Sequence, residues 1–147
     1  QNYQRICNSN NLNPHRVDNA LGYFFYGWRS RNFEHICINL AIVLETLFSP
    51  SSSIELSHQI AFNVSRFVGE NKEDRESIYD KIKKFYSLRS RIVHGGQTNN
   101  DDLYDNVPDV FHICAGVLKK ILLDYKLAQI FCQDQNRQRL FKEWLFT

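Results

Sequence analysis

The sequence predicts an all-α protein, built as a helical bundle of about five to six helices. Only 6 glycines and 3 prolines interrupt the 147 residues, and apolar residues recur at steps of three and four, the period of an amphipathic helix. Hydrophobic residues make up 43% of the chain and charged residues 23%, which supplies a core and is not typical of disorder. The chain opens on Gln1 and contains no methionine. We therefore expect residues 1–147 to form a single domain excised from a longer protein.

The first expected helix runs from about Pro14 to Ser30. Asn13 is placed to cap it, and proline suits the first helical position because its missing N–H would have no helical partner there. The apolar face of this helix is expected to consist of Val17, Leu21, Phe24, Phe25 and Trp28.

The second expected helix, from about Phe33 to Phe48, is apolar nearly all round, which is typical of a central, buried helix. Pro50 and the serines after it end this run. The third helix is expected to start near Ser52, where Ser52 and Glu55 fit a capping box, and to end at Gly69. Its inward face is expected to hold Ile60, Val64, Phe67 and Val68.

The fourth expected helix runs from about Lys72 to His94, with Asn71 as its cap. A polar loop over residues 95–106 follows, and a fifth helix is expected from about Pro108 to Phe131. A last short helix from about Arg137 to Phe146 closes the domain. Its aromatic residues are expected to pack on the bundle or on a partner: Phe141, Trp144 and Phe146.

Two charged residues stand in apolar stripes. In the fourth helix, the stripe that passes through Phe85 reaches Arg89 at its next position. In the second helix, Glu45 interrupts the face between Ile42 and Phe48. Charged groups are rarely buried without a partner, so we expect Glu45 and Arg89 to meet between the two central helices. Such a pair can be purely structural or can belong to a functional site.

His94 follows Arg89 by five residues, which sets the two side chains about 140° apart on a regular helix. Gly95 and Gly96 end the helix, so His94 can turn with the terminus. The helix dipole favours protonated His94, whereas Arg89 and Arg91 oppose it. A histidine under competing influences beside an arginine suits proton transfer next to a phosphate. The alternative is a histidine that only caps the helix.

These residues together resemble the HEPN domains, small all-α modules of prokaryotic toxins, CRISPR effectors and other ribonucleases. The segment RSRIVH at 89–94 fits their R-x4-H motif. The resemblance is closest to the Apea-like branch and extends from about Glu34 to Gly96. The resemblance rests on four short motifs that occur in this order: Leu44-Glu45, Glu55-Leu56-Ser57, Tyr86 with Arg89-Ser90, and His94-Gly95.

The resemblance implies a metal-independent endoribonuclease that leaves 2′,3′-cyclic phosphate and 5′-hydroxyl ends, as in defence or toxin-like effectors. It implies that His94 is the general acid or base, that Arg89 holds the scissile phosphate, and that Glu45 orients Arg89. Ser90 is a further candidate, standing where many active members have Asn, Asp or His, and Gly96 stands where many have Tyr. Some HEPN domains lack ribonuclease activity and serve as modules for RNA or nucleotide binding or for dimerisation, which is the alternative.

The resemblance also implies partners. HEPN sites are usually composite, with two R-x4-H segments facing each other, so we expect RNA as substrate and a homodimer or a second HEPN domain. The net charge is only +2 and the pI about 8.4, below the value of roughly 9 typical of nucleic-acid binders. A basic site is therefore expected to be local. Arg91, Lys84 and Lys81 are candidates to contact the RNA.

Other kinds of site are not expected. None of the 4 cysteines forms a CxxC pair, so we expect neither zinc nor a disulfide framework, and a reducing cytoplasm. His35 with Cys37, and His112 with Cys114, lie about 200° apart on a helix and cannot chelate a metal. There is no glycine-rich phosphate loop, so we expect no nucleotide cofactor. No apolar run or signal peptide indicates a membrane.

Overall fold

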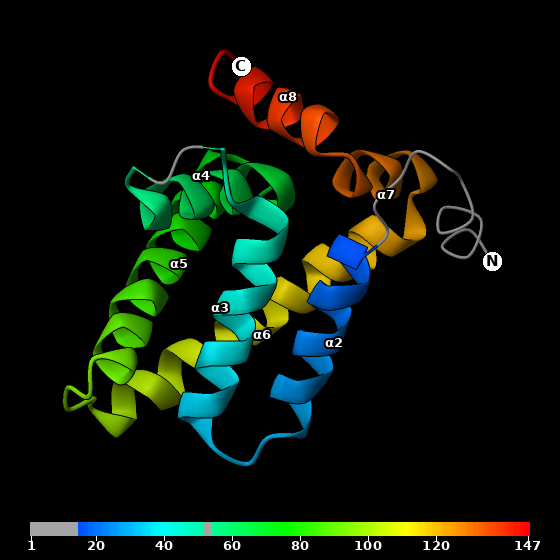
Figure 1. Cartoon of the computed structure of the whole chain (residues 1–147). Coiled ribbons are helices and arrows are strands. Elements are labelled where there is room, and N and C mark those ends of the chain that lie inside the picture. Colours follow the sequence, from blue (N-terminus) through cyan, green and yellow to red (C-terminus); the bar gives the residue numbers. More distant parts are fainter. Residues whose placement is uncertain (1–14, 52–53) are drawn as a thin grey trace.

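The computed structural model describes residues 15–51 and 54–147, and every secondary-structure element in these ranges is a helix (Figure 1). The all-α prediction is confirmed, although the described residues form seven helices rather than five to six. In chain order they are α2 (His15–Arg29), α3 (Phe33–Phe48), α4 (Leu56–Val68), α5 (Lys72–Val93), α6 (Asn100–Leu123), α7 (Tyr125–Cys132) and α8 (Asp134–Trp144).

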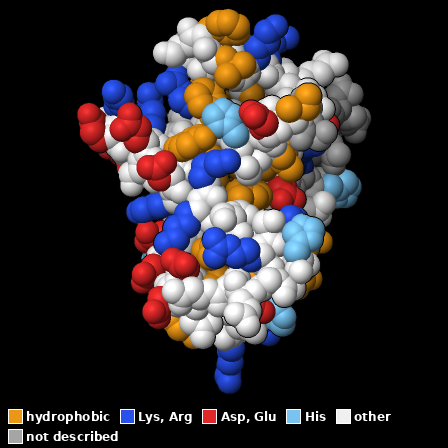
Figure 2. All heavy atoms as spheres, turned by 90° about the vertical axis from the view of Figure 1, so that its left-hand side faces the viewer, with side chains coloured by type: hydrophobic (Ala, Val, Ile, Leu, Met, Phe, Trp, Pro, Cys, Tyr) orange, Lys and Arg blue, Asp and Glu red, His pale blue; other side chains and the backbone are white. Residues whose placement is uncertain are grey.

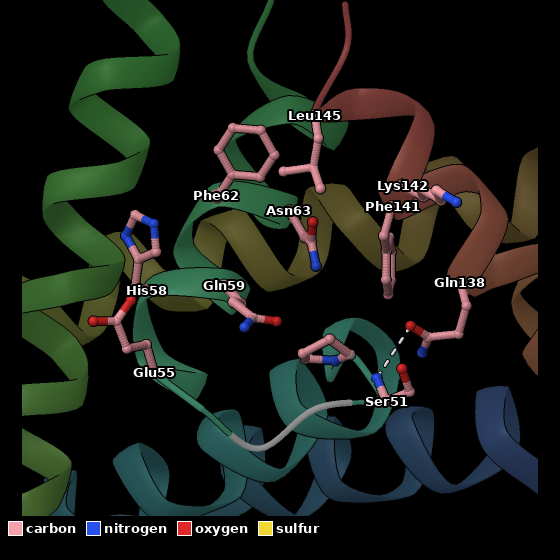
Figure 3. A pocket seen from close by; sticks show the side chains of 11 residues that line it. Ser51, Glu55, His58, Gln59, Phe62, Asn63, Gln138, Phe141, Lys142 and Leu145 are labelled. Atoms are coloured by element: carbon pink, nitrogen blue, oxygen red, sulfur yellow. Dashed lines mark hydrogen bonds between the residues drawn. The ribbon is translucent and has the colours of Figure 1, made fainter.

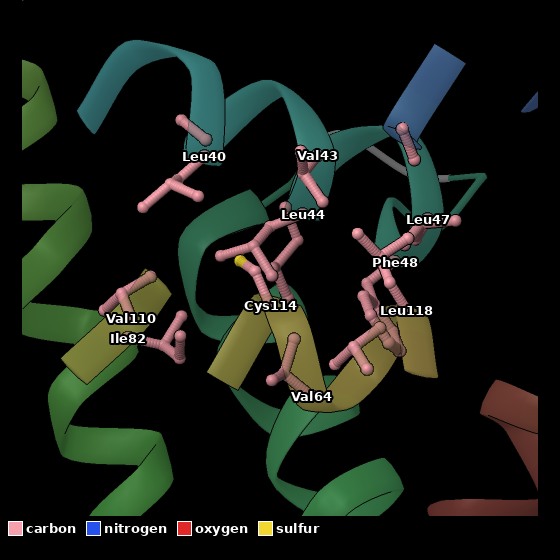
Figure 4. Packing of buried hydrophobic residues seen from close by; sticks show 14 of the residues in the cluster. Leu40, Val43, Leu44, Leu47, Phe48, Val64, Ile82, Val110, Cys114 and Leu118 are labelled. Carbon is pink, nitrogen blue, oxygen red and sulfur yellow. The ribbon is translucent and has the colours of Figure 1, made fainter. Parts of the chain in front are cut away.

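Helices α3 and α6 cross near the centre of the bundle (Figure 1). Helix α5 lies on one side of them, α2 lies on the other, and α8 lies across one end. Hydrophobic side chains of α3, α4, α5 and α6 fill the space between these four helices, as Figure 4 shows. Fully buried members of this core include Leu40, Leu44, Leu47, Phe48, Ile60, Ile82, Phe85 and Ile121.

Local capping signals set the starts of α3 and α5. The side chain of Asn32 accepts a hydrogen bond from the backbone N–H of His35 at 3.0 Å, and that of Asn71 accepts from Asp74 at 2.8 Å. Each bond satisfies one of the backbone donors that a helix leaves free at its first turn. The bounds expected for the second helix are confirmed, and those of the fourth differ only in its last residue, because His94 is the C-cap.

Helix α6 is the main departure from the prediction. It begins at Asn100, inside the expected polar loop, and continues through Pro108. The side chain of Asn99 caps it by accepting from the N–H of Asp101 at 3.1 Å, and acidic residues in the first turn suit the positive end of the helix dipole. These features start a helix upstream of the proline, and the helix continues through Pro108 although a proline removes one N–H donor and crowds the carbonyl four residues earlier.

The expected fifth helix is also broken near its end. Asp124 has extended backbone angles, and its side chain accepts from the N–H groups of Lys126 at 2.9 Å and Leu127 at 3.2 Å. It therefore ends α6 and caps α7. This break accounts for the additional helix.

Two other helix starts differ from the prediction. Helix α4 begins at Leu56, and Glu55 is its N-cap in a left-handed conformation with φ of 52°, rather than the third residue of a capping box. Ser52, like Asn13 and Pro14, lies outside the described residues. Helix α8 begins at Asp134, earlier than expected.

The predicted apolar faces are partly wrong. Phe25 and Trp28 of α2 are 53% and 64% exposed, and Phe146 is 80% exposed, whereas Phe141 and Trp144 do pack on the core. Helix α2 instead approaches α3 at Gly27, where an added Cβ would lie 3.3 Å from Cβ of Asn39. This close approach turns the two aromatic side chains away from the core.

Candidate functional site

Arg89 and Glu45 form the contact that their positions predict. The Nη2 atom of Arg89 on α5 lies 3.6 Å from Oε1 of Glu45 on α3, and the two side chains are 35% and 28% exposed. The pair thus lies at the edge of the core rather than deep within it. A distance of 3.6 Å is too long for a hydrogen bond, and Nε of Arg89 is buried without a hydrogen-bond partner. The guanidinium therefore retains donors for a further anion.

A hollow of about 580 Å³ opens beside this pair, and we call it the Arg89 hollow. It is lined by Glu45 from α3, by Leu56 and Ser57 from the start of α4, and by one side of α5 that includes Tyr86 and Ser90. Residues of the Leu-Glu motif, the Glu-Leu-Ser motif and the Tyr-x-x-Arg-Ser motif thus meet at this hollow. They are separated along the chain, so this convergence is a property of the fold.

The Arg89 hollow carries an excess of positive charge. Lys83, Arg89 and Arg91 line it, and Glu45 is the one acidic side chain among the described residues of its lining. Figure 2 shows Lys and Arg side chains spread across this side of the molecule, while acidic side chains gather along the left edge of the view. A local field of this kind attracts anions although the net charge of the chain is small.

Burial raises the pKa values of two side chains that line the hollow, Glu45 and Tyr86. Removal of Glu45 from water raises the pKa of its carboxyl, and the charge of Arg89 only partly opposes that rise. Burial also raises the pKa of Tyr86 well above its ordinary value, and the neighbouring Glu45 charge adds to the rise. The Tyr86 hydroxyl is therefore a neutral donor at physiological pH, and it is buried without a hydrogen-bond partner.

His94 lies at the end of α5 in the expected glycine-terminated geometry. The N–H of Gly95 donates to the carbonyl of Ile92 at 3.2 Å, and that of Gly96 donates to Arg91 at 2.8 Å. Gly95 has a φ of +69°, so these bonds form a Schellman motif that needs a left-handed residue. His94 is exposed and is not among the residues that line the Arg89 hollow. One chain therefore does not bring His94 and Arg89 into the same cavity.

The other predicted site residues fall into two groups. Ser90 and Arg91 line the Arg89 hollow. Lys81 and Lys84 instead face α6, where their Nζ atoms pair with Asp109 at 3.1 Å and Asp102 at 2.9 Å. Their charges are offset by these carboxylates.

The sequence did not distinguish Lys83 from its neighbours Lys81 and Lys84, whereas the structure does. The Nζ atom of Lys83 donates a hydrogen bond to Oγ of Ser57 at 3.1 Å, inside the hollow. The available signal was the spacing of Lys83, Tyr86, Ser87 and Ser90. Residues at i, i+3, i+4 and i+7 share one face of a helix, and this face has polar tips at all four positions.

A second cavity of about 590 Å³ lies between α4 and α8 (Figure 3). Phe62, Phe141 and Leu145 contribute apolar side chains to it. The Gln138 side-chain amide already makes two hydrogen bonds within the protein: it accepts from the N–H of Ser51 and donates to the Ser49 carbonyl, both at 3.1 Å. This cavity lacks the paired arginine and carboxylate of the Arg89 hollow, so it is a weaker candidate for chemistry.

The described part of the chain offers neither a metal site nor a membrane-spanning helix. Within residues 15–51 and 54–147, no group of three or more His, Cys, Asp or Glu side chains could hold a metal ion. Cys37 and Cys114 are buried while their neighbours His35 and His112 are exposed, as the helical geometry requires. No helix of the same two ranges has the length and apolar character needed to cross a membrane.

Comparisons of the chain with protein-family models, with curated proteins and with solved structures gave no match.

Proposed function

We propose that this protein is a metal-independent endoribonuclease of the HEPN type, which cleaves RNA to 2′,3′-cyclic phosphate and 5′-hydroxyl ends, in a defence or toxin-like role. The observation that carries the proposal is the Arg89 hollow, where Glu45, Ser57, Tyr86, Arg89 and Ser90 converge. Together with Leu56, six residues of the motifs that resemble HEPN domains thus lie around one positively charged cavity.

Arg89 is proposed to hold the scissile phosphate. Nη2 of its guanidinium lies 3.6 Å from Oε1 of Glu45, and its Nε has no hydrogen-bond partner among the described residues. A phosphate oxygen is the ligand that a planar guanidinium binds best through two donors. In this role Arg89 stabilises the charge that develops on the phosphate as the 2′-hydroxyl attacks. Glu45 is a positioning residue that orients the guanidinium, and Ser90 is an adjacent hydroxyl donor.

His94 is proposed as the general acid or base. It is exposed at the end of α5 and lies outside the lining of its own Arg89 hollow. A second chain, or a second HEPN domain, is therefore needed to bring a histidine to the phosphate that Arg89 holds. This requirement is consistent with the composite sites expected from the R-x4-H resemblance.

The second candidate function is a HEPN module that binds RNA or a nucleotide without cleaving it. The separation of His94 from the Arg89 hollow favours this candidate, because the described residues that line the hollow offer cations and hydroxyls but no histidine. Binding would then depend on Arg89 and not on His94.

The two functions are separated by incubating the purified protein with end-labelled RNA in excess EDTA. We expect cleavage with cyclic phosphate ends by the wild type, and loss of cleavage in Arg89→Ala and in His94→Ala. His112→Ala is the matched control, because His112 is an exposed helical histidine far along the chain from the motif. Cleavage that survives both site substitutions would refute the proposed site. RNA binding without cleavage, weakened by Arg89→Ala alone, would favour the binding module.

A further inference from the structure

The end of the Arg89 hollow nearest α4 has features that the proposed roles of Arg89 and His94 do not use. Ser57 is the second residue of α4, and its hydroxyl accepts a hydrogen bond from Lys83 at 3.1 Å. Both side chains line the hollow. A lysine ammonium has three donors, so Lys83 has donors left for another acceptor in the cavity.

The lysines at positions 81, 83 and 84 of α5 have different partners. Lys81 and Lys84 are each paired with an aspartate of α6. By contrast, no carboxylate of the described residues lies within ion-pair distance of Lys83, which is bonded to a neutral hydroxyl instead. The uncompensated charge of this helix face thus lies where it can meet an anion in the hollow.

The start of α4 adds a second favourable feature. This helix is 13 residues long, and its N-cap Glu55 makes no side-chain capping bond. The first turn of a helix carries backbone N–H groups without helical partners and the positive end of the dipole, which together favour an anion. Leu56 and Ser57 place this first turn at the wall of the hollow.

Tyr86 provides an observation, independent of Lys83 and of the start of α4, that also indicates a bound ligand. Its side chain lines the hollow, the residue is only 8% exposed, and its hydroxyl has no hydrogen-bond partner. A buried hydroxyl without a partner is unfavourable, and such groups are uncommon in native proteins. An oxygen of a bound ligand would accept the bond that the hydroxyl lacks.

We propose that this end of the hollow binds a phosphate of the RNA strand next to the one that Arg89 holds. Lys83, Ser57 and the first turn of α4 are its ligands, and the Tyr86 hydroxyl donates a hydrogen bond to it. The assignment rests on the proposed function, because it places a second phosphate of the same strand. The volume of about 580 Å³ lies within the range of about 300–1,000 Å³ typical of ligand pockets. The site then recognises two consecutive phosphates of a single strand.

Binding to a labelled single-stranded 2′-O-methyl RNA tests this assignment, since a strand with methylated 2′-oxygens lacks the attacking hydroxyl. Fluorescence anisotropy gives the Kd of the full chain at several salt concentrations. Lys83→Ala should weaken binding about tenfold at low salt, and should reduce the slope of log K against log salt by about 0.7. Ser57→Ala and Tyr86→Phe should weaken binding without changing that slope, because neither removes a charge.

Lys72→Ala is the matched control. Lys72 lies on the same helix, but its side chain is 82% exposed and lies outside the lining of the hollow. This variant should bind with the wild-type Kd and slope. If Lys83→Ala has the wild-type slope, or if Lys72→Ala weakens binding as much as Lys83→Ala, the assignment is overturned. Circular dichroism of each variant confirms that the helices remain folded.

A mononucleotide and inorganic phosphate, used as competitors, identify the source of the phosphate. The strand should bind about tenfold more tightly than either, because it engages two sites at once. Equal affinities would overturn the assignment to a strand and indicate a free nucleotide or phosphate. A wild type that binds in a Lys83-dependent way but cleaves no RNA would disprove only the proposed catalysis. Cleavage together with Lys83-independent binding would disprove only the second phosphate site.

Discussion

The substitution Glu45→Gln separates a functional role of the Arg89–Glu45 pair from a structural one. It removes the carboxylate charge but keeps the size and shape of the side chain. At the observed 3.6 Å, two unit charges attract by about 5 kcal/mol at an effective dielectric constant of about 20, and by about 1 kcal/mol in water. Both side chains are about one-third exposed, so the net contribution should lie near the ~0.2–1 kcal/mol of surface pairs.

The burial of Glu45 acts in the opposite direction. Because it raises the pKa of Glu45 above the ordinary 4.5, the folded protein binds a proton here more readily than the unfolded chain. The free energy of unfolding therefore falls as the pH rises from 4.5 through the raised pKa, and this loss is absent in the glutamine variant. At pH 7 we expect Glu45→Gln to change the free energy of unfolding by less than about 1 kcal/mol.

Activity should respond far more strongly than stability. If Glu45 orients Arg89 on the phosphate, Glu45→Gln should lower the cleavage rate by about 100-fold, as small misplacements of a binding group do. Urea unfolding between about pH 4 and pH 8 and cleavage of labelled RNA give the two quantities for one preparation. Glu76→Gln is the control, because Glu76 is exposed on α5 and its one ion pair among the described residues is with Lys72 at 3.8 Å. Loss of more than about 3 kcal/mol of stability would contradict the reasoning and identify a buried structural pair.

Three further results are expected. Gly95→Ala should lower the free energy of unfolding by about 1–2 kcal/mol in urea, because φ is +69° there; an unchanged value would disprove the strain. Arg137→Met should cost about 1–3 kcal/mol, because the buried Nη1 donates to the carbonyl of Leu47 at 2.7 Å, and a stable variant would contradict that role. Burial raises the pKa of the Cys37 thiol to about 12 and that of Cys114 further. Both should therefore resist iodoacetamide at pH 8 until the protein unfolds, which mass spectrometry of the labelled peptides would show.

Signals that act over a few residues allowed most of the fold to be predicted. The side chain of Asn71 begins α5 by accepting from the N–H of Asp74, and the N–H groups of Gly95 and Gly96 end the helix by donating to backbone carbonyls of its last turns. Such bonds depend on the local sequence alone. The predicted start of α6 was wrong because it relied on a different local signal, Pro108, and overlooked the cap at Asn99.

The candidate site depended on packing, which the sequence specifies less directly. Arg89 and Glu45 could be paired because each breaks an apolar stripe, and their contact is confirmed at 3.6 Å. The direction of Lys83 could not be predicted in this way, because it depends on how α5 is rotated against α4. The same rotation places Lys81 and Lys84 against α6. Similarly, the exposure of Trp28 follows from the approach of α2 to α3 at Gly27.

We propose that Arg89 of one chain and His94 of another act on the same phosphate. The most direct test mixes two variants, Arg89→Ala and His94→Ala, each of which should be inactive alone. They are unfolded together, refolded to exchange chains, and assayed for RNA cleavage in EDTA. Cleavage with cyclic phosphate ends should reappear in the mixture, because a mixed pair of chains retains one Arg89 and one His94. A mixture no more active than either variant alone, beside an active wild type, would contradict this proposal.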